Sequence, residues 1–480
     1  MARIIGKGFS FDDVLLVPQR TSVRSRKDTD TSTLITKNIK LNIPMISLCM
    51  STVTESRMAI SMALEGGMGI IHRFMSIEEQ ALEVRKVKKS MNRIIEDPLC
   101  ISENSVLEEA VKVVEENNDV RSLLVVDREK KLAGILTRRD FAFEENMAKP
   151  VKELMTKRER LITANPNVGI EEAMRLLKEN RIEKLPLVDN EDNVKGLITI
   201  KDIINLERYK NACRDKNGRL VVGAAIGIKG DYFERAEALV KEGVDVLVID
   251  VAHAHSDLAI EAIKKIKECL GVELIAGNVA TGKGTEDLIK AGADGVKIGI
   301  GNGTICTTRI VAGAGVPQMT ALMEAVEVGR KYDIPIISDG GIATPGNFTK
   351  ALAVGASAHM FGSVFAGTDE TPGPIIYKKD KQFKQYHGST SYLANVIKKE
   401  RETKTKVNDF LEDAFVEGVE SLVPYKGPVK GVINRFMKGL RSGMSYCGAR
   451  TIPEMWENSE FIELSEGSVK ESGAHDVIEV

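Results

Sequence analysis

Residues 295–309 read GVKIGIGNGTICTTR, a short apolar segment followed by a glycine-rich turn that ends on a cysteine. Gly299, Gly301 and Gly303 can take positive φ angles and let the backbone come close to a bound group. The apolar segment before them has the composition of a strand. Because α/β enzymes keep their chemistry on loops at the carboxyl ends of strands, this stretch favours an α/β fold with its active site at the turn.

The cysteine of this turn, Cys306, is a candidate nucleophile. It stands on a polar loop beside Thr304, Thr307 and Thr308. A thiolate presented in this way can attack an electrophilic carbon. The alternative is a structural cysteine buried after a tight turn, and the local sequence leaves both interpretations open.

Strands and helices alternate on both sides of this stretch, which predicts the fold. Strand-like segments after residue 219 lie at 220–225, 244–250, 273–278, 295–298, 335–339 and 359–362. Helical patterns between most of them lie at 231–242, 257–269, 285–291, 319–331 and 347–354. Two more strand-like segments, 43–47 and 68–72, flank a helix near the amino terminus. Eight such units favour a (β/α)₈ barrel over an open sheet.

The middle of the chain contains one unit twice. Each copy contains a predicted helix, a predicted strand and then a segment of the form G-x-x-T-x-x-D. The threonines of the two G-x-x-T-x-x-D segments stand 62 residues apart. A fixed repeat indicates duplicated modules. We therefore predict an inserted module at residues 93–207, between barrel parts at 1–92 and 208–480.

The duplicated unit resembles a tandem CBS (Bateman) module. The resemblance implies that Thr137 and Asp140 of the first copy, with Thr199 and Asp202 of the second, bind regulatory nucleotides of the ATP or GTP type. The alternative is that both aspartates cap helices, because each opens a segment with helical periodicity.

Composition limits the class of protein. The chain has 480 residues, of which 43% are hydrophobic. It is longer than the chains that one hydrophobic core usually supports, so two or three domains are expected. A net charge of −2 with acids and bases interspersed does not indicate a nucleic-acid-binding surface, and it leaves small anionic ligands as partners. Six widely separated cysteines form no zinc or disulfide pattern, and no signal peptide or membrane span is found. We expect a cytoplasmic protein without membrane contacts that associates with copies of itself.

Polar residues also close the neighbouring strand-like segments. Asp250 ends an apolar segment and can accept hydrogen bonds from a ribose, or cap the helix that follows. The run Asp339-Gly340-Gly341 can place a carboxylate near a sugar and free amides near a phosphate. Gly362 and Ser363 end the next segment in the same way. Two glycine turns on successive strand ends favour a phosphate-binding cradle.

Together these motifs resemble the IMP dehydrogenase / GMP reductase family over nearly the whole chain. The resemblance rests on FSFDDVLLVP at 9–18, DVAHAHS at 250–256, GIGNGTICTTR at 299–309, VPQMTA at 316–321, SDGGI at 338–342, VPYKGPV at 423–429, GLRSGMSYCGA at 439–449 and ESGAHDV at 471–477. The cysteine loop combined with the aspartate-glycine cradle is specific. It favours Cys306 as the nucleophile over a structural cysteine.

The resemblance implies a chemistry and a set of site residues. The thiolate of Cys306 adds to C2 of a purine 5′-nucleotide such as IMP, XMP or GMP, and hydride passes between C2 and NAD, or NADPH in a reductase. Thr308 relays protons. The implied substrate-binding residues are Thr304, Asp339, Gly341, Gly362, Ser363, Tyr386 and Gly388. The implied cofactor-binding residues are Asp250, Ser256, Asn278, Gly299 and Gly301.

The resemblance also implies a potassium ion and an oligomer. The ion is bound by carbonyl oxygens, and such oxygen-rich ligation suits a hard cation. Its implied ligands are Gly299, Gly301 and Cys306, with Glu471, Ser472 and Gly473 from a neighbouring copy of the chain. The implied assembly is a homotetramer or an octamer.

The flap, residues 385–425, bears on the direction of the reaction. Dehydrogenases of the family carry Tyr-Arg-Gly-Met-Gly-Ser where residues 386–391 read YHGSTS, and further on an Arg-Tyr pair that activates water. No Arg-Tyr pair lies between Ser391 and Glu417. Hydrolysis of the cysteine-bound intermediate needs a base. The absence of the Arg-Tyr pair therefore favours the ammonia chemistry of a GMP reductase.

Other motifs favour the dehydrogenase. The implied potassium ligands, DVAHAHS, VPYKGPV and ESGAHDV follow its pattern, and Glu417 or Arg401 can take the role of the base. IMP dehydrogenase is therefore our preferred interpretation, with GMP reductase as the alternative. A non-catalytic sensor of purine nucleotides is a third hypothesis, and the intact Cys306 loop argues against it.

Overall fold

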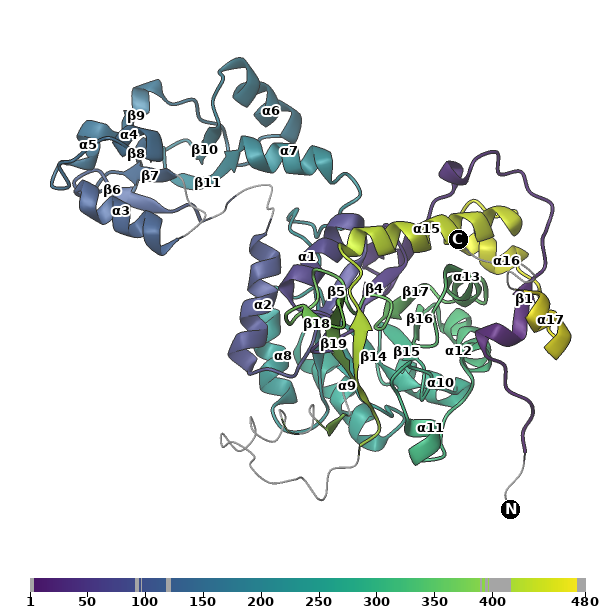
Figure 1. Ribbon diagram of the computed structural model, residues 1–480. Helices are drawn as coiled ribbons and strands as arrows, with labels where there is room; N and C mark the ends of the chain where they lie inside the picture. Colours follow the sequence, from purple (N-terminus) through teal and green to yellow (C-terminus); the bar gives the residue numbers. More distant parts are fainter. Residues whose placement is uncertain are drawn as a thin grey trace. The chain divides into compact units, whose positions relative to one another are not determined.

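The computed structural model (Figure 1) describes residues 4–90, 95, 97–117, 122–388, 391–392, 396 and 416–472. The chain divides into two compact units. The larger unit consists of Met1–Ser90 and Asn211–Val480, and the smaller unit consists of Met91–Lys210. Within the described residues, no helix is long and apolar enough to cross a membrane.

A closed barrel of parallel strands forms the centre of the larger unit. In chain order its strands are β4 (Met45–Ser47), β5 (Met68–Ile71), β12 (Gly223–Ile226), β13 (Val246–Asp250), β14 (Glu273–Val279), β15 (Gly295–Ile298), β16 (Ile336–Asp339) and β17 (Ala358–Phe361). The barrel closes where β5 pairs with β12 and β17 pairs with β4. Nearly all strand residues are buried, because helices cover the outside and side chains fill the inside. The predicted (β/α)₈ barrel is confirmed.

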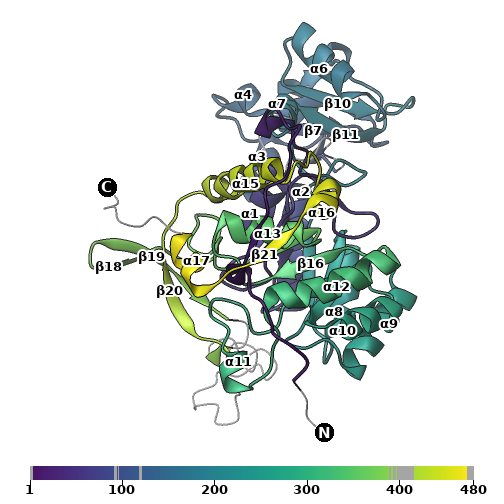
Figure 2. The ribbon, with the colours of Figure 1, turned by 90° about the vertical axis from the view of Figure 1, so that its right-hand side faces the viewer.

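Helices surround the barrel (Figures 1 and 2). They are α1 (Ser56–Glu65), α2 (Ile77–Lys89), α8 (Tyr232–Lys241), α9 (Asp257–Cys269), α10 (Gly282–Lys290), α12 (Gln318–Tyr332) and α13 (Pro345–Ala353). α13 shows why such a helix begins where it does. Thr344 and Asn347 form a reciprocal capping box at its start, and Pro345 occupies the first helical turn. Its buried face includes Phe348, which packs edge-on against Phe361 of β17.

The two largest boundary errors are of three residues each, and both have a local reason. The strand predicted at 220–225 begins only at Gly223, because Leu220 makes an isolated bridge to Arg214 before the chain enters the barrel. The helix predicted from residue 285 begins at Gly282. There the Thr281 side chain caps the first turn by accepting a hydrogen bond from the Gly284 amide, and this bond offsets the poor helix propensity of glycine.

An antiparallel sheet reaches from the barrel towards the cysteine loop. It consists of β18 (Ile376–Lys378), β19 (Lys381–His387) and β20 (Glu420–Pro424). Tyr386 on β19 pairs with Ser421 on β20. The pairing brings Tyr386 and the residues just before β20 to the same end of the sheet, although about thirty residues of the flap lie between them in sequence.

The remaining elements of the larger unit pack outside the barrel. They are η1 (Phe11–Asp13), β1 (Val14–Leu16), η2 (Arg26–Asp28), β2 (Thr33–Leu34), β3 (Lys40–Leu41), α11 (Thr308–Val311), α15 (Val429–Tyr446), α16 (Ile452–Asn458), β21 (Phe461–Glu463) and α17 (Glu466–Glu471). β1 pairs with β21, so segments from the two ends of the chain form one small sheet. α15 lies against α13 and buries a stripe of apolar side chains that includes Phe436.

The smaller unit repeats one arrangement. The first copy contains α3 (Leu107–Glu116), β7 (Ser122–Val126), β8 (Leu132–Thr137) and α4 (Arg138–Phe141), and the second contains α6 (Ile170–Glu179), β10 (Lys184–Val188), β11 (Val194–Thr199) and α7 (Ile200–Arg208). Additional elements are β6 (Cys100–Ser102), α5 (Val151–Leu154), β9 (Thr156–Lys157) and η3 (Arg158–Arg160). Each copy has its own apolar core, and a third cluster joins them.

Candidate active site

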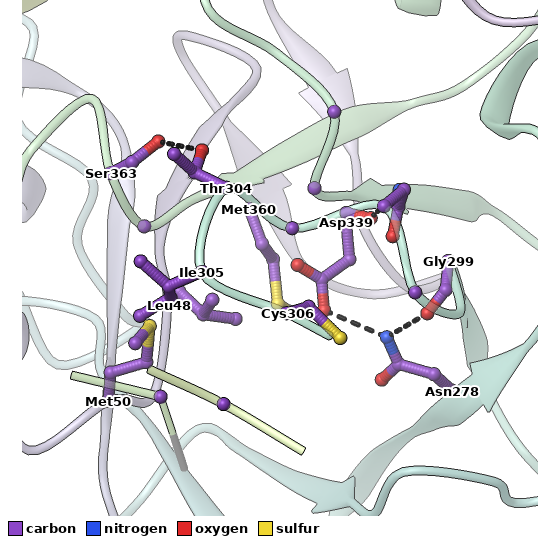
Figure 3. A pocket seen from close by; sticks show the side chains of 18 of the residues that line it. Leu48, Met50, Asn278, Gly299, Thr304, Ile305, Cys306, Asp339, Met360 and Ser363 are labelled. Carbon is purple, nitrogen blue, oxygen red and sulfur yellow. Dashed lines mark hydrogen bonds between the residues drawn. The ribbon is translucent and has the colours of Figure 1, made fainter. Parts of the chain in front are cut away.

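A pocket lies at the carboxyl ends of the barrel strands (Figure 3). It gathers most of the predicted site residues, although they come from different strands and from the flap region. Its lining includes Asp250, Asn278, Gly299, Gly301, Thr304, Cys306, Thr308, Asp339, Gly341, Gly362, Ser363, Tyr386, Gly388 and Glu417. The carboxyl ends of parallel strands meet at one edge, which is why distant segments converge here.

Some predicted site residues are not in this lining. Ser256 begins α9 and makes no capping bond, and it does not reach the pocket. Glu471 and Ser472 lie at the end of α17, also outside the lining. Arg401 and Gly473 fall outside the described residues.

Cys306 forms one end of a chain of polar groups. Its Sγ lies 3.2 Å from Thr308 Oγ1, and that hydroxyl donates to Glu417 Oε2 at 2.8 Å. The thiol is only partly buried, so a substrate can reach it. A thiol, a hydroxyl and a carboxylate in sequence provide a path along which a proton can leave or approach the sulfur.

The backbone holds this chain of groups together. The Thr307 amide donates to the Glu417 carbonyl at 2.9 Å, and the Val419 amide donates to the Ile305 carbonyl at 3.1 Å. Residues 417–419 therefore lie alongside the cysteine loop. Glu417 stands more than a hundred residues after Cys306, and spacing alone could not have placed the two together.

The opposite side of the pocket offers hydroxyls and backbone amides. Gly340 and Gly341 have φ angles of +81° and +78°, a conformation that turns successive amides in one direction. Thr304 Oγ1 lies 3.0 Å from Ser363 Oγ (Figure 3). Hydroxyls and free backbone amides of this kind can bind a phosphate.

Tyr386 adds a buried phenol near the same side. A Cβ at Gly362 would lie 3.0 Å from the Tyr386 hydroxyl, a tight contact that glycine avoids. Burial, and then the charge of Asp339, raise the pKa of the Tyr386 phenol. The phenol therefore keeps its proton and can donate it in a hydrogen bond.

Lys297 connects the two predicted sugar-binding carboxylates and was missed from the sequence. Its Nζ lies 2.7 Å from Asp250 Oδ1 and 2.7 Å from Asp339 Oδ2. Burial opposes the charge of Lys297, but the two carboxylates outweigh it and raise the lysine pKa. Burial likewise opposes the charge of Asp250, and Lys297 with Arg73 nevertheless lowers its pKa. Asp250 is therefore an ion-pair partner in the pocket and does not cap a helix.

The signal for Lys297 was present in the sequence. A lysine in an apolar parallel strand is buried on both faces and must have an anionic partner. Arg73 and His359, which also line the pocket, were missed too. Burial lowers the pKa of His359 to about 3, so a neutral imidazole faces the site.

Asn278 connects Asp339 to the glycine turn. Its Nδ2 donates to the Gly299 carbonyl at 2.6 Å and to Asp339 Oδ2 at 3.0 Å (Figure 3). A carbonyl oxygen has two lone pairs, so Gly299 keeps one for a cation. Carbonyl oxygens are ligands that suit hard cations. No cluster of three or more acidic, histidine or cysteine residues that could hold a metal is found in the described part of the chain.

The four polar residues singled out in the smaller unit form two equivalent pairs. Thr137 and Asp140 make a reciprocal capping box at the start of α4, with the Thr137 hydroxyl 2.8 Å from Asp140 Oδ2. The Thr199 hydroxyl donates to Asp202 Oδ2 at 2.6 Å, and the Asp202 amide donates back to it at 3.3 Å. Both aspartates thus have the helix-capping role that is the sequence-based alternative to nucleotide binding.

Comparison with known proteins gives one consistent match. The family model of the IMP dehydrogenase / GMP reductase domain matches residues 8–475. Inosine-5′-monophosphate dehydrogenase of Nitrosopumilus maritimus is 50% identical, covering 98% of this chain and 99% of that protein. GMP reductase of Leishmania major is 44% identical, covering 98% and 97%. A crystal structure of a Trypanosoma brucei GMP reductase variant with guanosine 5′-monophosphate has a TM-score of 0.91 at 42% identity, covering 99% of both chains.

Proposed function

The chain belongs to the IMP dehydrogenase / GMP reductase family of oxidoreductases, and on that premise we propose that it converts IMP, NAD⁺ and water into XMP, NADH and a proton. The observation that carries the proposal is the connected set Cys306, Thr308 and Glu417 in a pocket at the strand ends. It provides a nucleophile together with a route for protons.

The pocket supports a definite orientation of the nucleotide. The phosphate is bound by the Thr304 and Ser363 hydroxyls, the Tyr386 phenol and the backbone at Gly341 and Gly362. The ribose hydroxyls donate to Asp339. Asp250 and Asn278 lie on the dinucleotide side, and Gly388 faces the purine. Support for this arrangement comes from the fact that these residues and Cys306 line one pocket.

The reaction begins with the cysteine. The Cys306 thiol releases its proton to solvent, and the thiolate adds to C2 of the purine. NAD⁺, when bound on the side of Asp250 and Asn278, would supply the acceptor for the hydride of C2. This leaves a thioimidate between Cys306 and the nucleotide. Water then attacks C2, and Thr308 passes a proton from that water to Glu417. The carbon–sulfur bond breaks with its electron pair on Cys306, the proton returns from Glu417 through Thr308 to the sulfur, and XMP leaves.

GMP reductase is the second candidate, and two observations favour it. The sequence lacks an Arg-Tyr pair between Ser391 and Glu417. A solved structure that is similar to this chain is that of a GMP reductase. In that direction GMP and NADPH give IMP, ammonia and NADP⁺, and Thr308 with Glu417 would supply the proton to the departing ammonia.

Two absorbance assays on the purified full-length protein separate these candidates. The first supplies IMP and NAD⁺ and follows NADH, and the second supplies GMP and NADPH and follows loss of NADPH. The proposal predicts NADH and XMP in the first assay. Loss of NADPH with no XMP would reverse the order of the candidates, and no signal in either assay would favour a nucleotide sensor.

We further propose that residues 93–207 form a regulatory CBS pair that binds adenosine or guanosine nucleotides. Support comes from the equivalent positions of Thr137 with Asp140 and of Thr199 with Asp202, each at the end of the second strand of a copy. A ligand at these positions would compete with, or add to, the hydrogen bonds of the capping boxes.

Three further proposals follow from the family membership. A potassium ion is held by carbonyls of the Cys306 loop and by Glu471 and Ser472 of a neighbouring copy in a homotetramer or octamer. The second lone pair of the Gly299 carbonyl oxygen supports the proposed potassium site. A cytoplasmic location is supported by the cysteines, all of which are free.

A further inference from the structure

Lys297 is the most completely buried charged side chain of the pocket. It extends from β15 and is 1% exposed. It contacts carboxylates at the ends of β13 and β16, with both distances at 2.7 Å. Burying an ammonium is costly unless anionic partners surround it. A cluster of this kind at a ligand site therefore needs an explanation beyond packing.

The cluster leaves part of Asp339 free for a ligand. Its Oδ2 accepts from Lys297 and from Asn278. No donor among the described residues contacts its Oδ1. With one oxygen fixed by two bonds, the carboxylate cannot rotate, and the other oxygen stays available to the pocket.

We propose that Lys297 is a positioning residue, which fixes the carboxylates of Asp339 and Asp250 and thereby sets the preference for a ribose hydroxyl. The inference rests on the proposed function, because it takes Asp339 as the ribose acceptor. Lys297 itself does not contact the substrate. It acts by holding an ionised acceptor in one rotamer, and hydrogen bonds to such acceptors are the stronger ones.

The chain contains a matched control for this cluster. Lys88 on α2 is also buried, and its Nζ lies 2.6 Å from Asp245 Oδ2 and 3.0 Å from Asp215 Oδ2. Asp245 precedes β13, and Asp250 ends the same strand. Each cluster thus joins one buried lysine to two aspartates, and the two lie at opposite ends of one strand. Asp215 also pairs with Arg219, and only the cluster of Lys297 lines the pocket.

Binding of IMP and of its 2′-deoxy analogue tests the proposal. Dissociation constants are measured by calorimetry on full-length wild type, Lys297→Met and Lys88→Met, without NAD⁺ so that no turnover occurs. A hydrogen bond to a charged acceptor predicts that wild type prefers IMP by about tenfold. In Lys297→Met the preference falls below about threefold. Lys88→Met keeps the preference of wild type, although its melting temperature falls.

A second variant keeps the test decisive if Lys297→Met does not fold. The double variant Lys297→Met with Asp250→Asn removes one carboxylate together with the ammonium, so the formal charge of the cluster is unchanged. It should show the same reduced preference for IMP over the 2′-deoxy analogue, because the Asp339 carboxylate no longer contacts the ammonium group of Lys297. A wild-type preference in either Lys297 variant, or an equal loss in Lys88→Met, contradicts the inference.

The wild-type protein separates this inference from the proposed function. Wild type that binds IMP but does not distinguish the 2′-deoxy analogue overturns the inference alone. Wild type that binds neither IMP nor GMP overturns the proposed function and the inference with it.

Discussion

Thr308 and Glu417 take the proton of the attacking water, so a substitution of Glu417 should slow the hydrolysis step alone. In Glu417→Gln the Thr308 hydroxyl keeps a hydrogen-bond acceptor but loses a base. Hydride transfer should remain nearly intact, while hydrolysis slows by roughly 10²–10⁴-fold, as for loss of a general base. Stopped-flow absorbance should therefore show a burst of NADH before a slow steady state. Equal slowing of the burst and the steady state would contradict this role.

His359 should make the stability of the larger unit depend on pH. Its pKa of about 3 in the folded protein lies below the ordinary value of 6.5, so the unfolded chain binds more protons between these values. The free energy of unfolding should fall as pH falls below 6.5, by about 1.4 kcal/mol per pH unit from this residue alone. Urea unfolding followed by Trp456, the single tryptophan, measures it.

A variant and a control isolate this histidine. His359→Gln should give a flatter dependence of unfolding free energy on pH, between pH 5 and 7, than wild type. His253→Gln changes an exposed histidine and should leave the dependence as it is. Identical slopes in wild type and His359→Gln would show that other groups cause the acid sensitivity.

The residues of the site differ in how well the sequence could predict them. Cys306 and Asp339 stand in or beside glycine-rich turns at the ends of strands, and such turns indicate a ligand-binding site. Lys297 has no motif of its own, and its two partners come from strands that are distant in sequence. Its role depends on the three-dimensional order of the strands, which spacing along the chain does not contain.

Among the elements, the glycine turn after β15 depends most on backbone conformation. Gly299 has a φ of +149°, and a Cβ there would lie 2.1 Å from the Asp339 carbonyl oxygen. Gly299→Ala must displace the turn or the end of β16, at a cost of about 1–3 kcal/mol in unfolding free energy. Urea unfolding should show the loss, and activity should fall with it because Cys306 follows in the same loop.

Gly303→Ala is the control within the same turn. Its Cβ would meet Cys306 Cβ at an ordinary 3.4 Å, without a positive φ. It should retain the unfolding free energy of wild type. Equal stabilities for the two variants would mean that the turn adjusts without cost.

Helix and strand boundaries were predicted less well than the elements themselves. The start of α10 at Gly282 contradicts intrinsic propensity, because a single side-chain cap by Thr281 decides it. The apolar periodicity that predicted the other helices and strands reflects which face is buried, and burial supplies most of their stability.

At the scale of the whole molecule, the two compact units should be separable. The chain leaves the larger unit after Ser90 and returns at Asn211. Joining residues 92 and 208 with a short linker should give a folded, active barrel that nucleotides no longer regulate, since inserted domains have close termini. Steady-state rates with and without ATP or GTP test this. An insoluble or inactive product would show that residues 93–207 are needed by the barrel.

The formation of a covalent bond at Cys306 tests the central claim most directly. Wild type and Cys306→Ala are mixed with IMP and NAD⁺, quenched in acid during turnover and digested for mass spectrometry. The account predicts a nucleotide adduct on the Cys306 peptide of wild type. It also predicts that Cys306→Ala binds IMP but retains less than about a hundredth of the rate. Turnover by Cys306→Ala above that level, or an adduct on another residue, would contradict it.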